Sequence, residues 1–153
     1  MLSIERAQDG HTLHVGANLR QADRNEIAAS VGLTDETVQG WVLLEMVRIS
    51  AGAWNILDDG EAVAVLGVSN EGLIWMVGTP KLIRQRREFL RGSKRFLKAL
   101  KDLGFTRIFN HVDERNTTHI RWLKWLGASF SGRWEYRHDP NIKFLEFSLC
   151  VSS

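Results

Sequence analysis

Residues 108–130, "IFNHVDERNTTHIRWLKWLGASF", contain the signals of a strand, a helix and a second strand in one short segment. The first five residues include β-branched and aromatic side chains, as is typical of a strand. Asn116 can cap the helix that follows, because its side-chain oxygen can accept a hydrogen bond from a first-turn amide. Apolar residues then recur at helical spacing: Ile120, Leu123 and Leu126. Gly127 suits the left-handed residue that ends a helix, so a strand is expected to follow.

Length and composition predict one ordinary globular domain. The chain has 153 residues, of which 44% are hydrophobic and 25% are charged, and this length is enough to bury a single core. Its one cysteine, Cys150, excludes an internal disulfide and a Cys-rich zinc site. No apolar run approaches the ~18 residues of a membrane span, and the N-terminus lacks a signal-peptide pattern. We therefore expect a single intracellular domain over residues 1–153.

The positive charge is concentrated in one segment. Residues 81–101, "KLIRQRREFLRGSKRFLKALK", hold nine of the 20 Lys and Arg residues and a single acid, Glu88. The rest of the chain holds 11 basic and 17 acidic residues, a net charge of −6. A basic helix over 84–101 makes nucleic acid a possible partner, because Lys and Arg neutralise phosphates. A solvated helix face and a docking site for an acidic protein are the alternatives.

Periodicity and turn residues predict the order of helices and strands. Strands are expected at 2–6, 53–57, 61–68, 72–78, 106–112, 129–136 and 143–151, and helices at 13–29, 36–49, 84–103 and after Asn116. Thr34 is the expected N-cap of the second helix, and Asp139 with Pro140 the turn of the last hairpin. This order predicts an α/β fold with a mixed, mainly antiparallel sheet flanked by helices.

The order and its ending resemble the GNAT N-acetyltransferase superfamily. The characteristic ending of that superfamily is a strand, then D-x-x-N, then a helix that ends in L-G-F/A, then a strand. The corresponding residues are Asp113, Asn116, Leu126 and Gly127. The resemblance implies a single GNAT-like domain and a site for acyl-CoA.

Three longer stretches are similar to a narrower group, the GNAT-like proteins of short-tailed phages. They are "NLRQADRNEI", "GTPKLIRQRREFLRGSKRFL" and "VDERNTTHIRWLKWLGA". Members of this group are identified as internal virion or virion-assembly proteins, and some as acetyltransferases. The resemblance implies phage structural proteins as partners. It also implies a location in the host cytoplasm during assembly, or inside the virion.

The resemblance also assigns residues to a coenzyme site. In the superfamily the pantetheine arm of acetyl-CoA pairs with the backbone of the fourth strand, and the equivalent residues are Met76, Val77, Gly78 and Thr79. Asn116 belongs to the same implied site. Because backbone pairing needs no special side chain, these residues neither support nor exclude binding.

The pyrophosphate signature of the superfamily, Q/R-x-x-G-x-G/A, is altered. Glycine in that signature lets the backbone approach the phosphates closely, but the equivalent window is "RQRREF". Arg84 keeps the first position, while Arg87 and Phe89 stand at the two small-residue positions. Arginine side chains, including Arg86, can still hold phosphates. We therefore expect acetyl-CoA binding to be weak or absent.

The set of residues expected to transfer protons is incomplete. Amine acetylation needs a base for the amine and an acid for the leaving thiolate. The usual acid of the superfamily is a tyrosine midway along the last helix, and its position is occupied by Leu123. His119 on the same helix and Glu26 on the first long helix are the remaining candidates for catalysis, with Asp23 beside Glu26. A packed histidine and solvated acids are the alternatives.

The sequence predicts no metal site. His11 and His14 have a spacing compatible with one helix face, but no further ligand follows them, so zinc is not expected.

The tryptophans divide into two sets. Trp41, Trp54 and Trp75 lie in apolar runs and are expected in the core. Trp122 and Trp125 point in different directions on one helix, so they cannot both be assumed buried.

Two functions from different classes remain. The first is a phage internal virion or assembly factor, built on a GNAT fold with a degraded acetyl-CoA site. The second is an active acyl-CoA-dependent N-acetyltransferase that modifies a host or phage amine. The lost glycines and Leu123 favour the first function.

Overall fold

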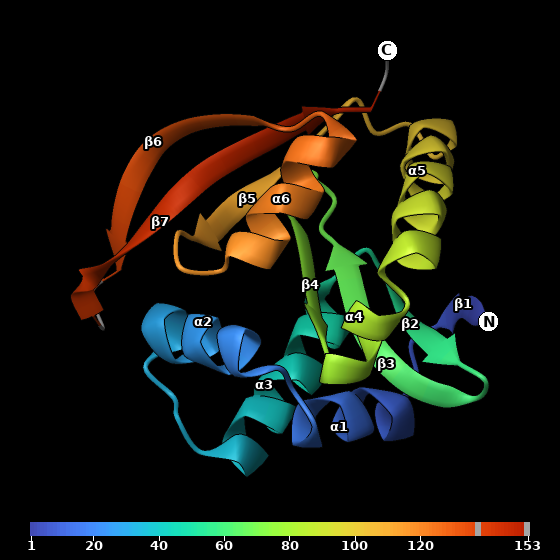
Figure 1. The fold of residues 1–153 in the computed structure, drawn as a ribbon, viewed down its shortest axis with the longest axis horizontal. Coiled ribbons are helices and arrows are strands. Elements are labelled where there is room, and N and C mark those ends of the chain that lie inside the picture. The colour runs from blue at the N-terminus through green and yellow to red at the C-terminus, as the bar shows by residue number, and fades with distance from the viewer. Residues whose placement is uncertain (137–138, 152–153) are drawn as a thin grey trace.

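The computed structural model describes residues 1–136 and 139–151, without the side chains of 134–136. Its strands form two sheets, a four-stranded sheet of order β1-β2-β3-β4 and a three-stranded sheet of order β5-β7-β6 (Figure 1). The strands are β1 (Leu2–Arg6), β2 (Gly52–Asp58), β3 (Glu61–Val68), β4 (Ile74–Gly78), β5 (Arg107–Asp113), β6 (Ser129–Tyr136) and β7 (Asp139–Cys150). Neighbours within each sheet are antiparallel, which confirms the predicted α/β fold.

The two sheets meet where β4 and β5 begin. Leu73 and Phe109 form an isolated parallel bridge, and the Phe109 amide donates to the Gly72 carbonyl at 3.0 Å. Asn110 adds a side-chain bond from its Nδ2 to the Ile74 carbonyl at 2.6 Å. Beyond this point β4 and β5 belong to separate sheets. A gap between the two strands is therefore a property of the fold itself.

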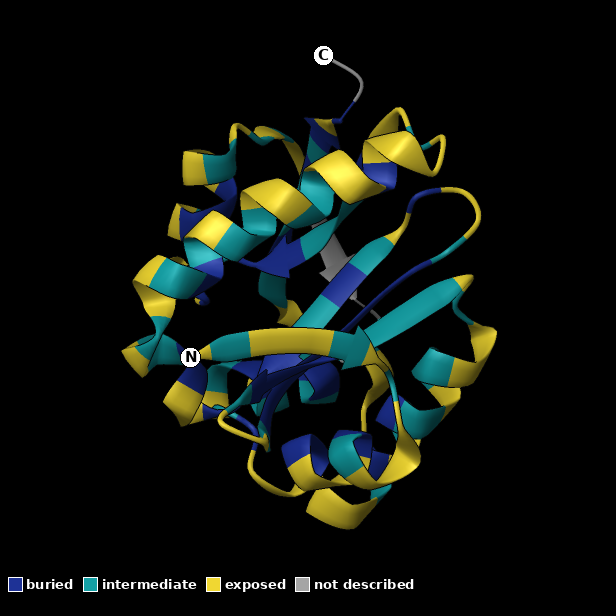
Figure 2. Ribbon diagram, turned by 90° about the vertical axis from the view of Figure 1, so that its right-hand side faces the viewer, coloured by how far each residue is buried: buried dark blue, intermediate teal, exposed yellow. Residues whose placement is uncertain are grey.

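Helices cover both faces of the sheets. They are α1 (Asp9–Ala17), α2 (Gln21–Val31), α3 (Glu36–Ile49), α4 (Pro80–Arg84), α5 (Arg86–Asp102) and α6 (Thr117–Leu126). Leu43 of α3 packs with Val65 and Val77 in one core cluster, whereas Phe89 of α5 packs with Leu66 in another. Side chains alternate between the faces of a strand, so each sheet face has its own helical cover. Figure 2 shows the buried strands inside and the exposed outer faces of the helices.

The helix predicted at 13–29 is two helices. α1 begins earlier than predicted, at Asp9, and ends at Ala17, and α2 begins at Gln21. Between them Asn18 donates its side-chain amide to the His14 carbonyl, and Arg20 has an extended backbone with ψ 145°. Such side-chain bonds compete with helix continuation. The break turns α2 toward the end of β4.

Several smaller predictions are wrong. The N-cap of α3 is Asp35 and not Thr34, because the Asp35 carboxylate accepts the Val38 amide at 3.0 Å. The predicted helix at 84–103 begins at Arg86 and is preceded by α4. Asp139 and Pro140 lie within β7, so they are not the hairpin turn, and residues 137–138 are outside the described ranges.

The tryptophans follow the predictions in part. Trp41 is 61% exposed, so its expected place in the core is wrong, whereas Trp75 is buried. Trp122 is buried and Trp125 is 48% exposed, which confirms that the two differ.

Within the described residues, none of the helices has the length and apolar character needed to cross a bilayer.

Substitution of Gly72 by alanine should destabilise the fold where the two sheets meet. Gly72 has φ +98°, and a Cβ there would collide with the carbonyl oxygen of Arg107. We expect a loss of roughly 2–5 kcal/mol, since both left-handed strain and overpacking act. Gly104→Ala is the matched control, because Gly104 has φ +99° but open space around it. Urea unfolding of both variants measures the difference, and equal losses would contradict this reading.

Candidate functional site

A large cavity extends from the gap between the sheets along the packed helices. Its volume is about 1110 Å³, and its walls come from β1 to β5 and β7 and from α2, α3, α5 and α6. Apolar side chains dominate the lining and include Ile74, Met76, Phe96, Trp122 and Leu126. Two titratable candidates from the sequence, Glu26 and His119, also line it. The fold therefore brings these two residues together around one space.

The free edge of β4 is bonded to α2. The Gly78 amide donates to Oδ2 of Asp23 at 2.9 Å, and the Gly78 carbonyl accepts from the Arg20 amide at 2.9 Å. These are the polar groups of a residue that the resemblance assigned to pantetheine. Asp23 is buried, and removal from water raises the pKa of its carboxyl despite the nearby Arg20. The chain itself thus occupies this part of the strand edge.

The other residues assigned to the fourth strand have different surroundings. Met76 is partly buried and Val77 is buried, and both line the cavity. Thr79 donates its amide to the Val63 carbonyl, so it continues the pairing with β3. Its buried hydroxyl has no hydrogen-bond partner within the described part of the chain. The role of these residues in coenzyme binding stays a prediction.

Glu26 connects α2 to the end of β5. Its Oε1 accepts the Asp113 amide at 2.8 Å and lies 3.4 Å from the side-chain nitrogen of Asn116. Burial raises the pKa of Glu26 to about 8, and the neighbouring carboxylates of Asp23 and Asp113 act in the same direction. Glu26 therefore holds a proton at neutral pH. Together Asp23 and Glu26 join the separated ends of β4 and β5.

Asn116 caps α6, as predicted, and also contacts α2. Its Oδ1 accepts the His119 amide at 3.4 Å and the Arg20 guanidinium at 3.0 Å. Burial and the positive charge of Arg20 lower the pKa of His119 to about 4. The imidazole is therefore neutral at physiological pH. Sequence patterns suggested that Arg20 could pair with the acids of α2, but they did not predict that it would reach Asn116.

The predicted pyrophosphate site lacks the open backbone that glycine would supply. Phe89 is buried, and its ring lies 4.7 Å from that of Trp122. The Glu88 carboxylate accepts the Leu2 amide at 2.7 Å, which places an acid at the start of α5. Arginines are nevertheless present around a separate hollow of about 480 Å³, lined by Arg84, Gln85, Arg86, Arg87, Glu88, Arg91 and Arg95.

Leu123 occupies the interior of the protein. It is buried in a cluster with Val112 and Phe147, although its side chain also reaches the cavity wall. A hydrocarbon there can donate no proton. The neighbouring position on α6 carries Trp122, whose ring faces Phe89 and lies beneath the Arg20 guanidinium at 5.8 Å. The side chain of the only tyrosine, Tyr136, lies outside the described residues.

Residues 55–135 match the family described as "Bacteriophage T7, probable scaffold protein Gp13". The match covers more than half of the chain. The protein belongs to this family. This membership confirms the resemblance to GNAT-like phage proteins, which rested on three stretches of sequence. A comparison with curated proteins found none that matches the chain.

Solved structures similar to this Gp13-family protein are GNAT acetyltransferases. A GNAT-family acetyltransferase from Bacillus anthracis superposes with a TM-score of 0.71 at 13% identity, over 99% of this chain and 96% of the other. An N-acetyltransferase from Staphylococcus aureus Mu50 has a TM-score of 0.70 at 11% identity, over 99% of both chains. A spermidine N-acetyltransferase from Vibrio cholerae, in complex with CoA and spermine, has a TM-score of 0.68 at 12% identity, over 99% and 96%. The GNAT fold predicted from the sequence is confirmed.

The free energy of unfolding should fall between pH about 6.5 and about 8, and replacement of Glu26 by glutamine should reduce this fall. Between pH about 6.5 and about 8 the folded protein keeps the Glu26 proton, whereas the unfolded chain has lost it. Unfolding therefore releases a proton, and the free energy of unfolding decreases as the pH rises through this interval. The low pKa of His119 acts below this interval, because the imidazole of the unfolded chain charges only near pH 6.5.

Urea unfolding at the two ends of this interval measures the effect. Glutamine keeps an oxygen that can accept the Asp113 amide, so the variant should fold. Glu45→Gln is the control, because Glu45 is exposed on α3 and pairs only with Arg48 at 3.8 Å. A wild-type slope that persists in the Glu26→Gln variant would show that another group binds the proton.

Proposed function

We propose that this protein is a phage internal virion or virion-assembly factor whose GNAT fold has a degraded acetyl-CoA site. Membership in the scaffold-protein family supports the assembly role. The observation that carries the proposal is the hydrogen bond from the Gly78 amide to the buried Asp23 carboxylate. It fills the strand edge on which an acetyltransferase of this fold would bind its coenzyme.

The strength of that bond favours a strand edge that stays closed to the coenzyme. A hydrogen bond to a carboxylate is about twice as strong as one between neutral groups. The carbonyls of a pantetheine arm are neutral, so they would replace a stronger acceptor at Gly78. Their entry would also leave the buried Asp23 without its amide, which costs about 1–3 kcal/mol or more for a charged group. Coenzyme binding at this edge is therefore opposed by the protein's own side chain.

Two further features, at the start of α5 and midway along α6, support loss of the coenzyme function. Phe89 and the Glu88 carboxylate stand at the start of α5, where free amides would otherwise attract a pyrophosphate. Leu123 replaces the proton donor for the leaving thiolate. Binding of the diphosphate and protonation of the thiolate are both weakened, and the two losses are independent.

Isothermal titration with CoA tests the degraded site. We expect no binding tighter than a Kd of roughly 1 mM, because the strand edge and the phosphate cradle are both occupied. Any residual affinity should depend on the arginine hollow, so Arg84→Ala and Arg87→Ala should weaken it, whereas Arg48→Ala on α3 should not. Micromolar binding by the wild-type protein would overturn the proposal.

The cavity favours a second candidate, an acyl-CoA-dependent N-acetyltransferase acting on a host or phage amine. A volume of about 1110 Å³ can admit an acyl group and an amine. Glu26, with a pKa of about 8, can exchange a proton with the amine or the thiolate near neutral pH, and His119 lies beside it on the cavity wall. Turnover of acetyl-CoA with polyamines or phage proteins, lost in both His119→Gln and Glu26→Gln, would favour this candidate.

An assembly factor needs a surface that binds other phage proteins, and we assign this role to the basic face of α5. Its exposed bases are Arg86, Arg87, Arg91, Lys94, Arg95, Lys98 and Lys101, with Arg84 just before them. Within the described residues, none of the eight has a carboxylate within 4.0 Å. A surface of one sign attracts a partner of the opposite sign. We propose an acidic phage structural protein as that partner.

The same face also suits nucleic acid, whose phosphates would be neutralised by these bases. The protein would act in the host cytoplasm while particles assemble. Peptide mass spectrometry of purified virions measures whether it is then packaged inside the virion. Its detection in purified particles would identify it as an internal virion protein, and its absence would restrict it to assembly.

Charge reversal on α5 should impair assembly. In a host infected by phage lacking this gene, plasmid-borne Arg91→Glu/Arg95→Glu should reduce plaque formation at least about tenfold relative to wild type, since attraction becomes repulsion. Arg48→Glu/Arg107→Glu is the control with the same change in net charge. Equal plaque numbers for both double variants would remove the role of α5. Loss of oligonucleotide binding in the first variant alone, measured by fluorescence anisotropy, would reassign the face to nucleic acid.

A further inference from the structure

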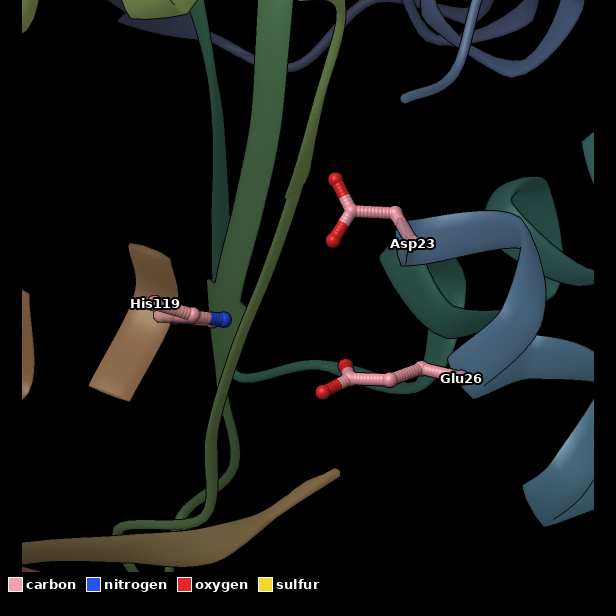
Figure 3. Close-up of side chains that lie close together, drawn as sticks. All are labelled: Asp23, Glu26 and His119. Atoms are coloured by element: carbon pink, nitrogen blue, oxygen red, sulfur yellow. The ribbon is translucent and has the colours of Figure 1, made fainter. Parts of the chain in front are cut away.

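Three potential metal ligands from two helices converge in the gap between the sheets. One oxygen of Asp23, one oxygen of Glu26 and one ring nitrogen of His119 lie within 4.8 Å of one another. Figure 3 shows the two carboxylates of α2 and the imidazole of α6 directed toward each other. We propose that Asp23, Glu26 and His119 bind a divalent transition-metal ion, Zn²⁺ or Mn²⁺.

The donor set and its spacing match such an ion. Carboxylate oxygen and imidazole nitrogen are ligands of Zn²⁺ and of Mn²⁺ in proteins. Bonds of about 2.0–2.2 Å put the ligands of one tetrahedral ion roughly 3.3–3.6 Å apart. Atoms of this cluster that are 4.8 Å apart therefore need to approach each other by about 1 Å or slightly more to share one ion. Side-chain rotation can supply a movement of that size without a change in the backbone.

The two carboxylates are held in place by backbone amides. Gly78 donates to Oδ2 of Asp23, and Asp113 donates to Oε1 of Glu26. These bonds engage Oδ2 of Asp23 and Oε1 of Glu26, and each carboxylate has a second oxygen that can bind a metal. Outer hydrogen bonds of this kind orient the ligands of metal sites and strengthen binding. Gly78 and Asp113, which donate these bonds, lie at the ends of strands in different sheets. The fold therefore sets the distance between the two carboxylates.

The imidazole is an independent indication of a ligand. It comes from a different helix, the residue is partly buried, and no hydrogen bond of the described residues reaches its ring nitrogens. A ring nitrogen without a hydrogen-bond partner is available as a metal ligand. Because His119 and Glu26 line the large cavity, an ion has a route to the cluster.

The charges around the cluster leave Asp23 and Glu26 as its acids. Asp113 is paired with Arg115, whose Nη2 lies 2.6 Å from Oδ2 of Asp113. Arg20 is 3.9 Å from Asp23 and also donates to Asn116. Binding of a dication requires Glu26 to lose the proton that it holds at neutral pH. A bound dication would link α2 to α6 across the open ends of β4 and β5.

Isothermal titration of the EDTA-treated full-length protein with ZnCl₂ and with MnCl₂ tests the site. We expect one ion per chain, and His119→Gln should weaken binding at least about tenfold, as loss of a ligand does. Because no hydrogen bond from the described residues reaches the His119 ring, this variant should fold, and circular dichroism checks that it does. Glu26→Gln should weaken binding as well, since an amide is a poorer ligand than a carboxylate.

Metal binding elsewhere on the protein surface must be distinguished from binding at the cluster. His14→Gln is the matched control, because His14 is exposed on α1 and lies outside the cluster. Unchanged affinity in His119→Gln, or an equal loss in His14→Gln, would overturn the proposal. The absence of binding by either metal at millimolar concentration would do the same. The result is independent of the proposed assembly role, because the titration contains no CoA and no phage partner.

Discussion

Two carboxylates on one turn of α2 hold together the ends of two sheets that are otherwise separate there. Asp23 accepts the amide of Gly78 at the end of β4, and Glu26 accepts the amide of Asp113 at the end of β5. Buried backbone amides need acceptors, and the divergence of β4 and β5 removes the ones that a continuous sheet would supply. The occupied edge of β4 and the burial of Glu26, which raises its pKa to about 8, both accompany this arrangement.

The same arrangement connects the fold to the proposed function. GNAT acetyltransferases have this fold, and a gap between the fourth and fifth strands is where the superfamily was expected to place its coenzyme. In this protein the gap keeps a large apolar cavity, but its open end is crossed by α2. Under the proposed function, the outer surfaces are the parts that bind partners. Among them is the basic face of α5, whose bases have no carboxylate within 4.0 Å in the described part of the chain.

Much of the fold was predictable because its signals are local. The antiparallel strands from β2 to β4 follow from turn residues and apolar runs, and the cap at Asn116 and the stop at Gly127 lie within one helix. The errors arose where a longer-range contact prevailed. The single helix predicted at 13–29 is broken because the backbone of Arg20 bonds to Gly78. Trp41 is exposed although its neighbours in sequence are apolar.

The sequence by itself determined the order of the elements, the family resemblance, the loss of the small residues at Arg87 and Phe89, and the replacement of a tyrosine by Leu123. Each of these is a property of residue identity at a position. Only the tertiary structure decided that Asp23, Glu26 and His119 share one space. Asp23 and Glu26 are neighbours on α2, but His119 is far from them along the chain, and its proximity to them depends on how α2 and α6 pack against separated sheets. A pattern search for metal ligands close in sequence cannot detect such a cluster.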